Sequence, residues 1–202
     1  MRIKSVEIEN FRGFQGSHDI NFSYEDNSVN LVIAENEIGK TSLLNAILWS
    51  LYGKLTESSQ EQESIINKDY VRICKKNKTK PQASVKLSLV SPENYNEFDP
   101  DVFQITRNIR DGQPSSGNIF VHLVDGITGN QKQISDPKEF INGFCPEAIA
   151  NYFFFDGEGI NKITNNEALL RESIRNIQGL DAAEKALSDL NVFQEKRIKE
   201  IK

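Results

Sequence analysis

The chain has 202 residues, 38% hydrophobic and 26% charged, a balance typical of a soluble globular protein with one main domain. Its 24 basic and 29 acidic residues give a net charge of −5, so total charge does not indicate nucleic-acid binding. Two distant cysteines, Cys74 and Cys145, with only two histidines, argue against a disulfide framework or a zinc site. Because the sequence has neither an apolar membrane span nor a signal peptide, we expect a cytoplasmic protein without a membrane partner.

The first strands are predicted at the N-terminus. Residues 2–9 alternate apolar and polar side chains, the period of a half-buried strand, and Asn-Phe-Arg-Gly-Phe at residues 10–14 closes it. A second strand is expected around residues 18–22, paired with the first through a turn at Gly16.

Residues 29–52, VNLVIAENEIGKTSLLNAILWSLY, are the most informative stretch of the chain. An apolar strand at residues 31–33 leads to a Gly-Lys-Thr turn and then to an amphipathic helix. In a phosphate-binding loop of this layout, backbone N–H groups and a helix N-terminus face a polyphosphate, a lysine neutralises its charge and a hydroxyl binds Mg²⁺. Those roles fall to Gly39, Lys40 and Thr41.

The loop departs from the pattern G-x-x-x-x-G-K-[ST] at its first position, where Ala34 replaces a glycine. A methyl group crowds a tight turn and disfavours positive φ, so some nucleotide affinity could be lost. The alternative is a chance Gly-Lys-Thr at a helix start, but the flanking strand and helix supply the context that the motif requires.

Residues 54–80 lose hydrophobic periodicity, which predicts a mobile insertion with one short helix. Residues 71–80, VRICKKNKTK, contain no acid and carry five basic side chains, namely Arg72, Lys75, Lys76, Lys78 and Lys80. This run could neutralise several DNA phosphates, or it could be an ordinary solvated loop, and the sequence leaves both interpretations open.

The second half of the chain predicts a meander and then helices. Alternation over residues 85–89, 103–109 and 119–123, with turn-forming residues between them, predicts antiparallel strands. Residues 137–150 predict a helix that Asp136 caps and Pro146 interrupts or restarts. After Gly179 a narrow apolar seam runs to the last residue, so we expect a longer natural protein in which residues 179–202 begin an antiparallel coiled coil after a lobe of residues 1–178.

Four features occur in order: residues 10–14, AENEIGKTS at 34–42, FFFDGE at 153–158, and the C-terminal helix. Together they resemble the N-terminal half of an ABC-type ATPase head of the SMC, RecF and SbcC group. The FFFDGE run is most similar to that of DndD proteins, the ATPases of DNA phosphorothioation systems. The resemblance implies an α/β fold, a P-loop NTPase lobe with an antiparallel β subdomain and the start of a coiled coil.

The resemblance also implies a site for ATP and Mg²⁺. Arg12 and Gly13 would lie beside the nucleotide. Its phosphates would be surrounded by Asn36, Glu37, Ile38, Gly39, Lys40, Thr41 and Ser42. In relatives a strand ends in a Gln-Gly-Glu-like turn that approaches the metal, and here Asp156 takes that place, as a metal ligand with Thr41 and a catalytic residue with Lys40. For the three phenylalanines before it, the alternative is core packing, which we expect for the rings.

A complete ABC site also needs a Walker B strand, a signature motif and a switch histidine, which the resemblance assigns to a C-terminal half beyond the coiled coil. We therefore expect an ATPase that needs that half, a second head as homodimer partner, DNA, and a nuclease or modification subunit. Its role would be in DNA sulfur modification, antiphage defence or repair. Alternatives are a non-hydrolysing structural subunit that binds nucleotide or DNA, and a small-molecule P-loop kinase, which is disfavoured because a kinase should be complete in one short chain.

Overall fold

The computed structural model describes residues 2–25, 28–33, 39–56, 64–90, 101–147, 150 and 153–154. The chain divides into two compact units, residues 1–145 and 146–202. All helices and strands named below belong to the first unit. The expected coiled-coil segment, residues 179–202, lies outside the described residues.

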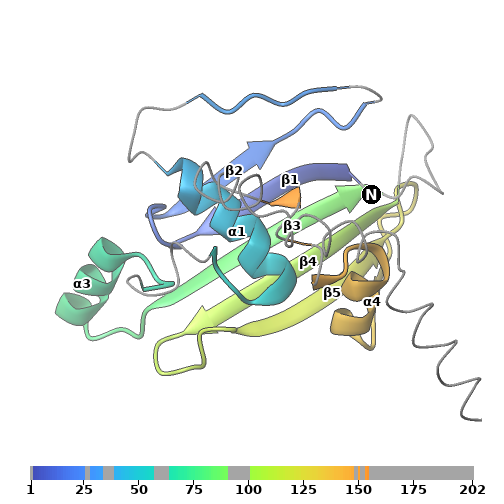
Figure 1. Ribbon diagram of the computed structural model, residues 1–202. Coiled ribbons are helices and arrows are strands. Elements are labelled where there is room, and N and C mark those ends of the chain that lie inside the picture. Colours follow the sequence, from blue (N-terminus) through green and yellow to red (C-terminus); the bar gives the residue numbers. More distant parts are fainter. Residues whose placement is uncertain are drawn as a thin grey trace, which may run out of the picture. The chain divides into compact units, whose positions relative to one another are not determined.

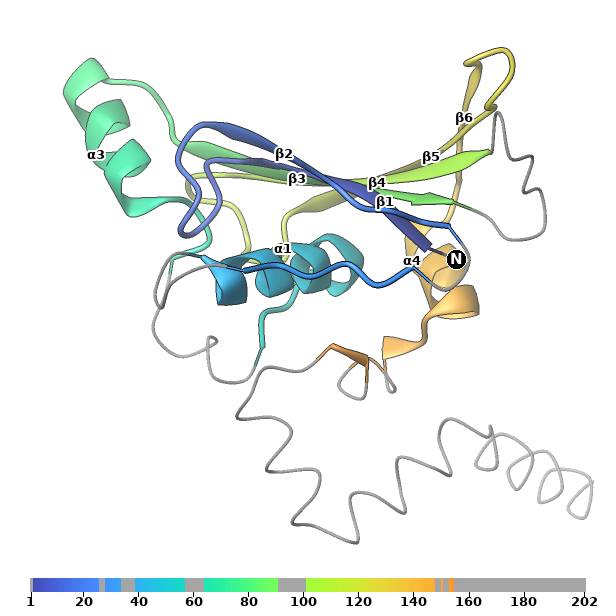
Figure 2. The ribbon, with the colours of Figure 1, turned by 90° about the horizontal axis from the view of Figure 1, so that it is seen from above.

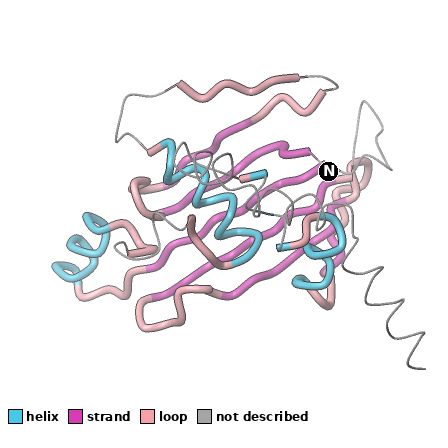
Figure 3. Tube along the Cα trace, viewed as in Figure 1, coloured by secondary structure: helices cyan, strands magenta, loops and turns pink. Residues whose placement is uncertain are grey.

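The first unit contains a six-stranded antiparallel sheet with the strand order β2-β1-β3-β4-β5-β6 (Figure 1). The strands are β1 (Arg2–Glu9), β2 (Ser17–Asn21), β3 (Gln82–Val90), β4 (Val102–Arg110), β5 (Asn118–Val124) and β6 (Gln131–Gln133). The predicted hairpin and meander are confirmed (Figure 3). Two features were not predicted. β1 also pairs with β3, which joins hairpin and meander into one sheet, and β6 has only three residues, too few to show a period.

The β1–β2 turn depends on Asn10. Its backbone N–H donates to the Gly16 carbonyl oxygen at 3.0 Å, and its Oδ1 accepts the Gly16 N–H at 2.9 Å. Asn10 and Gly16 have φ values of 51° and 79°, in a left-handed region that asparagine and glycine enter more readily than other residues. The turn therefore ends β1 at a defined residue and starts the Arg12–Gly13 segment from a fixed position.

The sheet has one buried face and one polar face, as expected for an antiparallel sheet that is covered on one side. A row of paired residues crosses β1, β3, β4 and β5 with no measurable exposure: Val6, Leu87, Ile105 and Val121. Glu7 of β1 and Lys86 of β3 are the register pair next to Val6 and Leu87, and their side chains form an ion pair of 2.8 Å. Alternation along each strand thus decides which residues form the core.

Helix α1 (Lys40–Tyr52) lies on the buried face, where it contacts β1, β3 and β4 (Figure 2). Eight of its residues are buried: Leu43, Asn45, Ala46, Ile47, Leu48, Trp49, Ser50 and Leu51. Buried positions therefore surround the helix, which corrects the expectation of an amphipathic helix. A helix with one apolar stripe packs on a single surface, whereas a helix that is buried all round lies inside the protein.

The C-terminal end of α1 is bound by a buried arginine of β4, Arg107, whose side chain is 4% exposed. Its Nε and Nη2 donate to the carbonyl oxygens of Ser50 and Leu51 at 3.2 and 3.0 Å, and its Nη1 donates to that of Ser116 at 2.7 Å. The guanidinium also lies 6.0 Å from the ring centroid of Trp49. Burial lowers the pKa of Arg107 to about 10, so it remains a cation at neutral pH and complements the negative end of the helix dipole.

Two further helices, α3 (Lys68–Asn77) and α4 (Pro137–Phe144), lie towards opposite ends of the sheet (Figures 1 and 2). Asp136 caps α4 as predicted, accepting the Glu139 N–H at 3.0 Å. The helix ends at Phe144, two residues before Pro146, in accord with the predicted interruption. α3 is the short helix expected within residues 54–80.

Residues 64–80, part of the expected mobile insertion at 54–80, have buried contacts with the first unit. Ile65 and Ile66 are buried, and Ile66 forms an antiparallel bridge with Phe11. The sequence lost its periodicity here because these two apolar residues anchor a bend rather than one face of a strand or helix.

The apolar segment before the phosphate loop differs from its predicted form. Residues 28–33 are not a strand, and within the described residues no strand of the sheet pairs with them. Leu31 and Ile33 are 80% and 84% exposed. The prediction was wrong here because apolarity alone does not make a strand, which needs a hydrogen-bonding neighbour to form.

Candidate functional site

The site begins at the N-terminus of α1. Lys40 is the first helical residue and Gly39 is the N-cap, so the helix starts where the Gly-Lys-Thr motif predicts. Gly39 has φ 102° and ψ 6°, a conformation that L side chains rarely adopt. A Cβ atom at this position would lie 3.6 Å from Cζ of Phe14, an ordinary contact distance. The need for glycine at position 39 therefore comes from the backbone conformation.

The N-terminus of α1 differs from those of the other two described helices. α3 and α4 are capped by the side chains of Asn67 and Asp136, and each has an acid in its first turn, Asp69 and Glu139. Within the described residues, α1 has neither a side-chain cap bond nor an acid in its first turn. Its first residue is a lysine, Lys40, as is that of α3, Lys68. The first N–H groups of a helix carry partial positive charge, and a lysine adds to that charge. This helix end therefore fits a bound anion.

The β1–β2 turn brings a second segment against the same helix end. A Cβ atom on Gly13 would lie 3.0 Å from Oγ of Ser42 and 3.9 Å from Cα of Gly39. The backbone at Gly13 thus passes directly against the first turn of α1, which leaves little room for a side chain there. The structure in this way brings Arg12–Gly13 and the Gly39–Ser42 segment together.

Arg12 is held at this position through its backbone. Its N–H donates to the Ile65 carbonyl oxygen at 2.9 Å, and its own carbonyl oxygen accepts Nδ2 of Asn67 at 2.6 Å. Arg12 has φ 47°, which costs a non-glycine residue about 1–2 kcal/mol. Such a conformation persists only where neighbouring contacts fix it, and it is common at functional sites.

Three residues support the site although the sequence alone assigned them no individual role. Asn10 forms the turn, and Phe11 is fully buried with its ring centroid 5.2 Å from that of Trp49 on α1. Asn67 both caps α3 and binds the Arg12 carbonyl group. Asparagine before a helical segment is a recognisable N-cap signal, but its second bond joins residues far apart in sequence.

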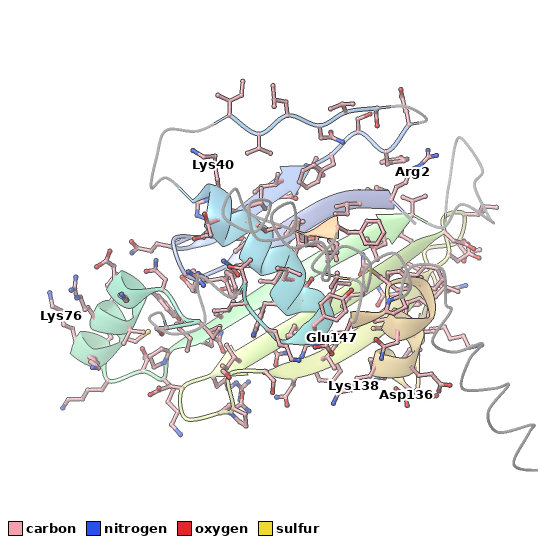
Figure 4. The ribbon with its side chains drawn as sticks, viewed as in Figure 1. Arg2, Lys40, Lys76, Asp136, Lys138 and Glu147 are labelled. Atoms are coloured by element: carbon pink, nitrogen blue, oxygen red, sulfur yellow. The ribbon has the colours of Figure 1, made fainter. Side chains whose placement is uncertain are left out.

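The predicted phosphate-contacting side chains are accessible. Lys40 and Thr41 are exposed at the start of α1, where Figure 4 shows Lys40, and Ser42 is half-buried. The carbonyl oxygen of Thr41 accepts Nδ2 of the buried Asn45 at 2.9 Å, which holds the first turn in place. The Thr41 hydroxyl is therefore presented from an ordered helical turn.

Other predicted site residues lie outside the described residues, namely Asn36, Glu37, Ile38 and Asp156. The described part of the chain contains no cluster of three or more His, Cys, Asp or Glu residues that could hold a metal ion. Among the helices that the structure describes, none has the length and apolarity needed to cross a membrane.

A helix that starts with Gly-Lys-Thr and packs on a sheet is typical of a P-loop NTPase. Residues 5–202 match the family model of the AAA domain, and the chain belongs to this family.

Three curated relatives share part of this sequence. The DNA replication and repair protein RecF of Bacillus cytotoxicus is 37% identical over 90 residues, covering 44% of this chain and 23% of the relative. The chromosome partition protein Smc of Fusobacterium nucleatum subsp. nucleatum is 25% identical over 94% of this chain and 17% of the relative. The DNA double-strand break repair Rad50 ATPase of Sulfurisphaera tokodaii is 35% identical over 34% of this chain and 7% of the relative. The chain thus spans less than a quarter of the length of these proteins.

Two solved structures share the fold. One comes from work on ATP-driven dimerization and DNA-stimulated activation of SMC ATPases, and it aligns with a TM-score of 0.52 at 18% identity over 88% of this chain and 99% of that chain. The other is the Smc head domain with a coiled coil and joint from Pyrococcus yayanosii, with a TM-score of 0.59 at 20% identity over 96% of this chain and 36% of that chain. At these identities the comparison shows the fold, and the predicted head fold is confirmed.

Proposed function

We propose that this chain is the N-terminal half of an ATP-binding and ATP-hydrolysing head in an SMC-like, DNA-processing ATPase. The observation that carries the proposal is the N-terminus of α1. Alone among the three described helices it combines a left-handed glycine cap with a first-turn lysine and no acid. Polyphosphate is the anion that a Gly-Lys-Thr helix start recognises.

The residues around this helix end fit Mg²⁺–ATP. Lys40 and the first-turn N–H groups would hold the β- and γ-phosphates, Thr41 would ligate Mg²⁺, and Arg12 would lie near the phosphates. Asn36, Glu37 and Ile38 would complete the loop. When bound, Mg²⁺–ATP supplies the phosphoanhydride bond whose cleavage allows a closed pair of heads to reopen. Catalysis would further require Asp156, as metal ligand and water-positioning residue.

A longer protein with a C-terminal half is supported by the exposed segment before the loop. Val29, Leu31 and Ile33 are 90%, 80% and 84% exposed and alternate along the chain. A contiguous exposed apolar segment marks a surface that another part of a protein covers. We propose that the C-terminal half covers it, and that a second, identical head completes the ATPase site.

The pathway is proposed from the FFFDGE run, whose similarity to DndD favours DNA sulfur modification or antiphage defence over repair. The partners would then be DNA and a nuclease or modification subunit, in the cytoplasm. The second candidate function is a non-hydrolysing structural subunit, which Ala34 favours because it replaces the first loop glycine.

The test compares Lys40→Ala with Lys138→Ala in the full-length protein. Both lysines lie in the first turn of a helix, but the helix of Lys138 has an Asp136 cap and an acid beside it (Figure 4). Calorimetry should show that Lys40→Ala loses detectable ATP binding and that Lys138→Ala binds like the parent. Equal ATP affinity in all three proteins would refute the site. ATP binding without turnover by the parent would select the non-hydrolysing alternative.

A further inference from the structure

Helix α3 and the turn after it form a strongly basic surface in a chain of net charge −5. We call this surface the basic ridge, and it comprises Lys68, Arg72, Lys75, Lys76, Lys78 and Lys80, all exposed. The only acid within residues 68–80 is Asp69, which pairs with Arg72 at 2.7 Å. The ridge therefore carries a local excess of positive charge, because it contains six basic residues and one acid.

The spacing of the basic side chains on the ridge fits a row of DNA phosphates. Lys68, Arg72 and Lys76 recur every four residues, which places them on one side of α3. At 1.5 Å per residue they span roughly 12 Å, which equals the rise along the duplex axis of about three to four phosphates of one DNA strand. Lys76 points away from the sheet in Figure 4.

A role in helix stability explains only part of the ridge. Lys75 and Lys76 lie in the last turn of α3, where cations favour the helix dipole by about 0.3–1 kcal/mol each. Lys68 lies at the opposite, positive end of the same helix, where a cation is unfavourable, and Lys80 lies beyond the helix. A partner with a row of negative charges accounts for the whole set.

The other side chains of α3 favour nucleic acid over a membrane or a protein. Ile73 is 43% exposed, and a single half-exposed isoleucine does not make an apolar face that inserts into a bilayer. The only aromatic residue, Tyr70, hydrogen-bonds with the buried Cys74, which raises the pKa of Tyr70. Protein interfaces depend on aromatic anchors, whereas phosphate contacts need mainly cations.

The ridge is also joined to the nucleotide site by hydrogen bonds. Asn67 caps α3 by accepting the Tyr70 N–H at 2.9 Å. The same residue donates its backbone N–H to the Asn10 carbonyl oxygen at 2.8 Å and its Nδ2 to that of Arg12 at 2.6 Å. Since Gly13 lies directly against Ser42, these bonds connect the start of α3 to the first turn of α1.

We propose that the basic ridge binds the phosphate backbone of double-stranded DNA, and that Asn67 couples this binding to Arg12 at the nucleotide site. The proposal rests on the proposed function, because the coupling has a target only if nucleotide binds at α1. The two sites are nevertheless tested separately below, since DNA binding is measured without nucleotide.

The first experiment measures binding of a random-sequence duplex to the full-length protein without nucleotide, by fluorescence anisotropy at several salt concentrations. Lys75→Gln/Lys76→Gln is compared with Lys132→Gln/Lys138→Gln, which removes the same charge from exposed lysines on β6 and α4. Each lost phosphate contact lowers the log–log salt slope by about 0.9, so the first variant should lose about 1.8 and the control nothing. The proposal would be overturned if both variants lost the same amount of salt slope or if the parent did not bind DNA. It would also be overturned if polyglutamate competed for the protein as strongly as unlabelled DNA does.

The second experiment uses the full-length protein and the ratio of ATP turnover with and without DNA. Asn67→Ser retains a good N-cap for α3, but its shorter side chain cannot reach the Arg12 carbonyl oxygen. DNA affinity should stay within about twofold of the parent, while the stimulation ratio should fall to about 1. Asn67→Asp, which keeps the cap and the size but loses the donor, should behave alike. DNA stimulation equal to the parent in both variants would overturn the coupling, whereas failure of the parent to bind ATP would refute the proposed function.

Discussion

The clearest stability prediction concerns Arg107, which joins β4 to the C-terminal end of α1. Arg107→Met keeps a long apolar side chain against Trp49 but removes the donors to three carbonyl oxygens. A buried acceptor left without a donor costs about 1–3 kcal/mol, so the three together cost about 6 kcal/mol. Burial of the charge, which lowers the pKa of Arg107 from 12.5 to about 10, itself costs about 3 kcal/mol, and the variant recovers this amount. The net destabilisation should be about 3 kcal/mol.

Thermal unfolding followed by circular dichroism measures this effect. For a protein of about 200 residues, a loss of 3 kcal/mol lowers Tm by roughly 6–12 °C. Arg110→Met is the matched control, since Arg110 ends the same strand but is exposed, and its Tm should remain close to the parent value. Arg107→Lys keeps the charge without the planar set of donors, so its Tm should fall between those of the parent and Arg107→Met.

The reasoning fails if Arg107→Met melts at the temperature of the parent, because the three bonds would then contribute nothing net. It also fails if Arg110→Met melts as low as Arg107→Met, because loss of any positive charge on β4 would then explain the effect. Nucleotide affinity at a temperature where the variant is folded should match the parent, since Arg107 contacts the end of α1 that is remote from Lys40.

Three further predictions follow from single residues. Gly117→Ala should destabilise the protein by about 3 kcal/mol in urea unfolding, because its Cβ would lie 2.5 Å from the Asn108 carbonyl oxygen. The control Gly112→Ala, whose Cβ would have nothing within 4 Å, should cost about 1 kcal/mol, and equal costs would contradict the steric account. The pKa of Asp125 is lowered by hydrogen bonds from the N–H groups of Thr128 and Ile127. Its contribution to stability is therefore present above its unfolded pKa and lost as pH falls through its folded pKa. Asp125→Asn should accordingly reduce the loss of unfolding free energy at acid pH, measured by urea unfolding at a series of pH values. Asp156→Asn in the full-length protein should reduce ATP turnover more than ATP binding, and turnover at the parent rate would make the FFFDGE run structural.

Much of the fold could be predicted because its signals are local. Period-two alternation identified four of the six strands, pairing through the Gly16 turn indicated a fifth, and the Gly-Lys-Thr motif indicated where α1 begins. The Asp136 cap and the end of α4 before Pro146 were recognisable for the same reason, since capping and proline effects act within a few residues. The Gly-Lys-Thr motif is equally local, and the phosphate site that it indicates at residues 39–42 remains a prediction.

What only the tertiary structure decided are contacts between segments that lie far apart in the chain. The pairing of β1 with β3 joins Val6 to Leu87, and the bonds of Arg107 join β4 to α1. Asn67 lies in an aperiodic stretch of the sequence, and only the fold places its Nδ2 against the Arg12 carbonyl oxygen. The sequence determined where most of the strands and helices lie, because those depend on near neighbours. The partners of a buried polar group depend on which distant segments meet, and only the packed chain determines that.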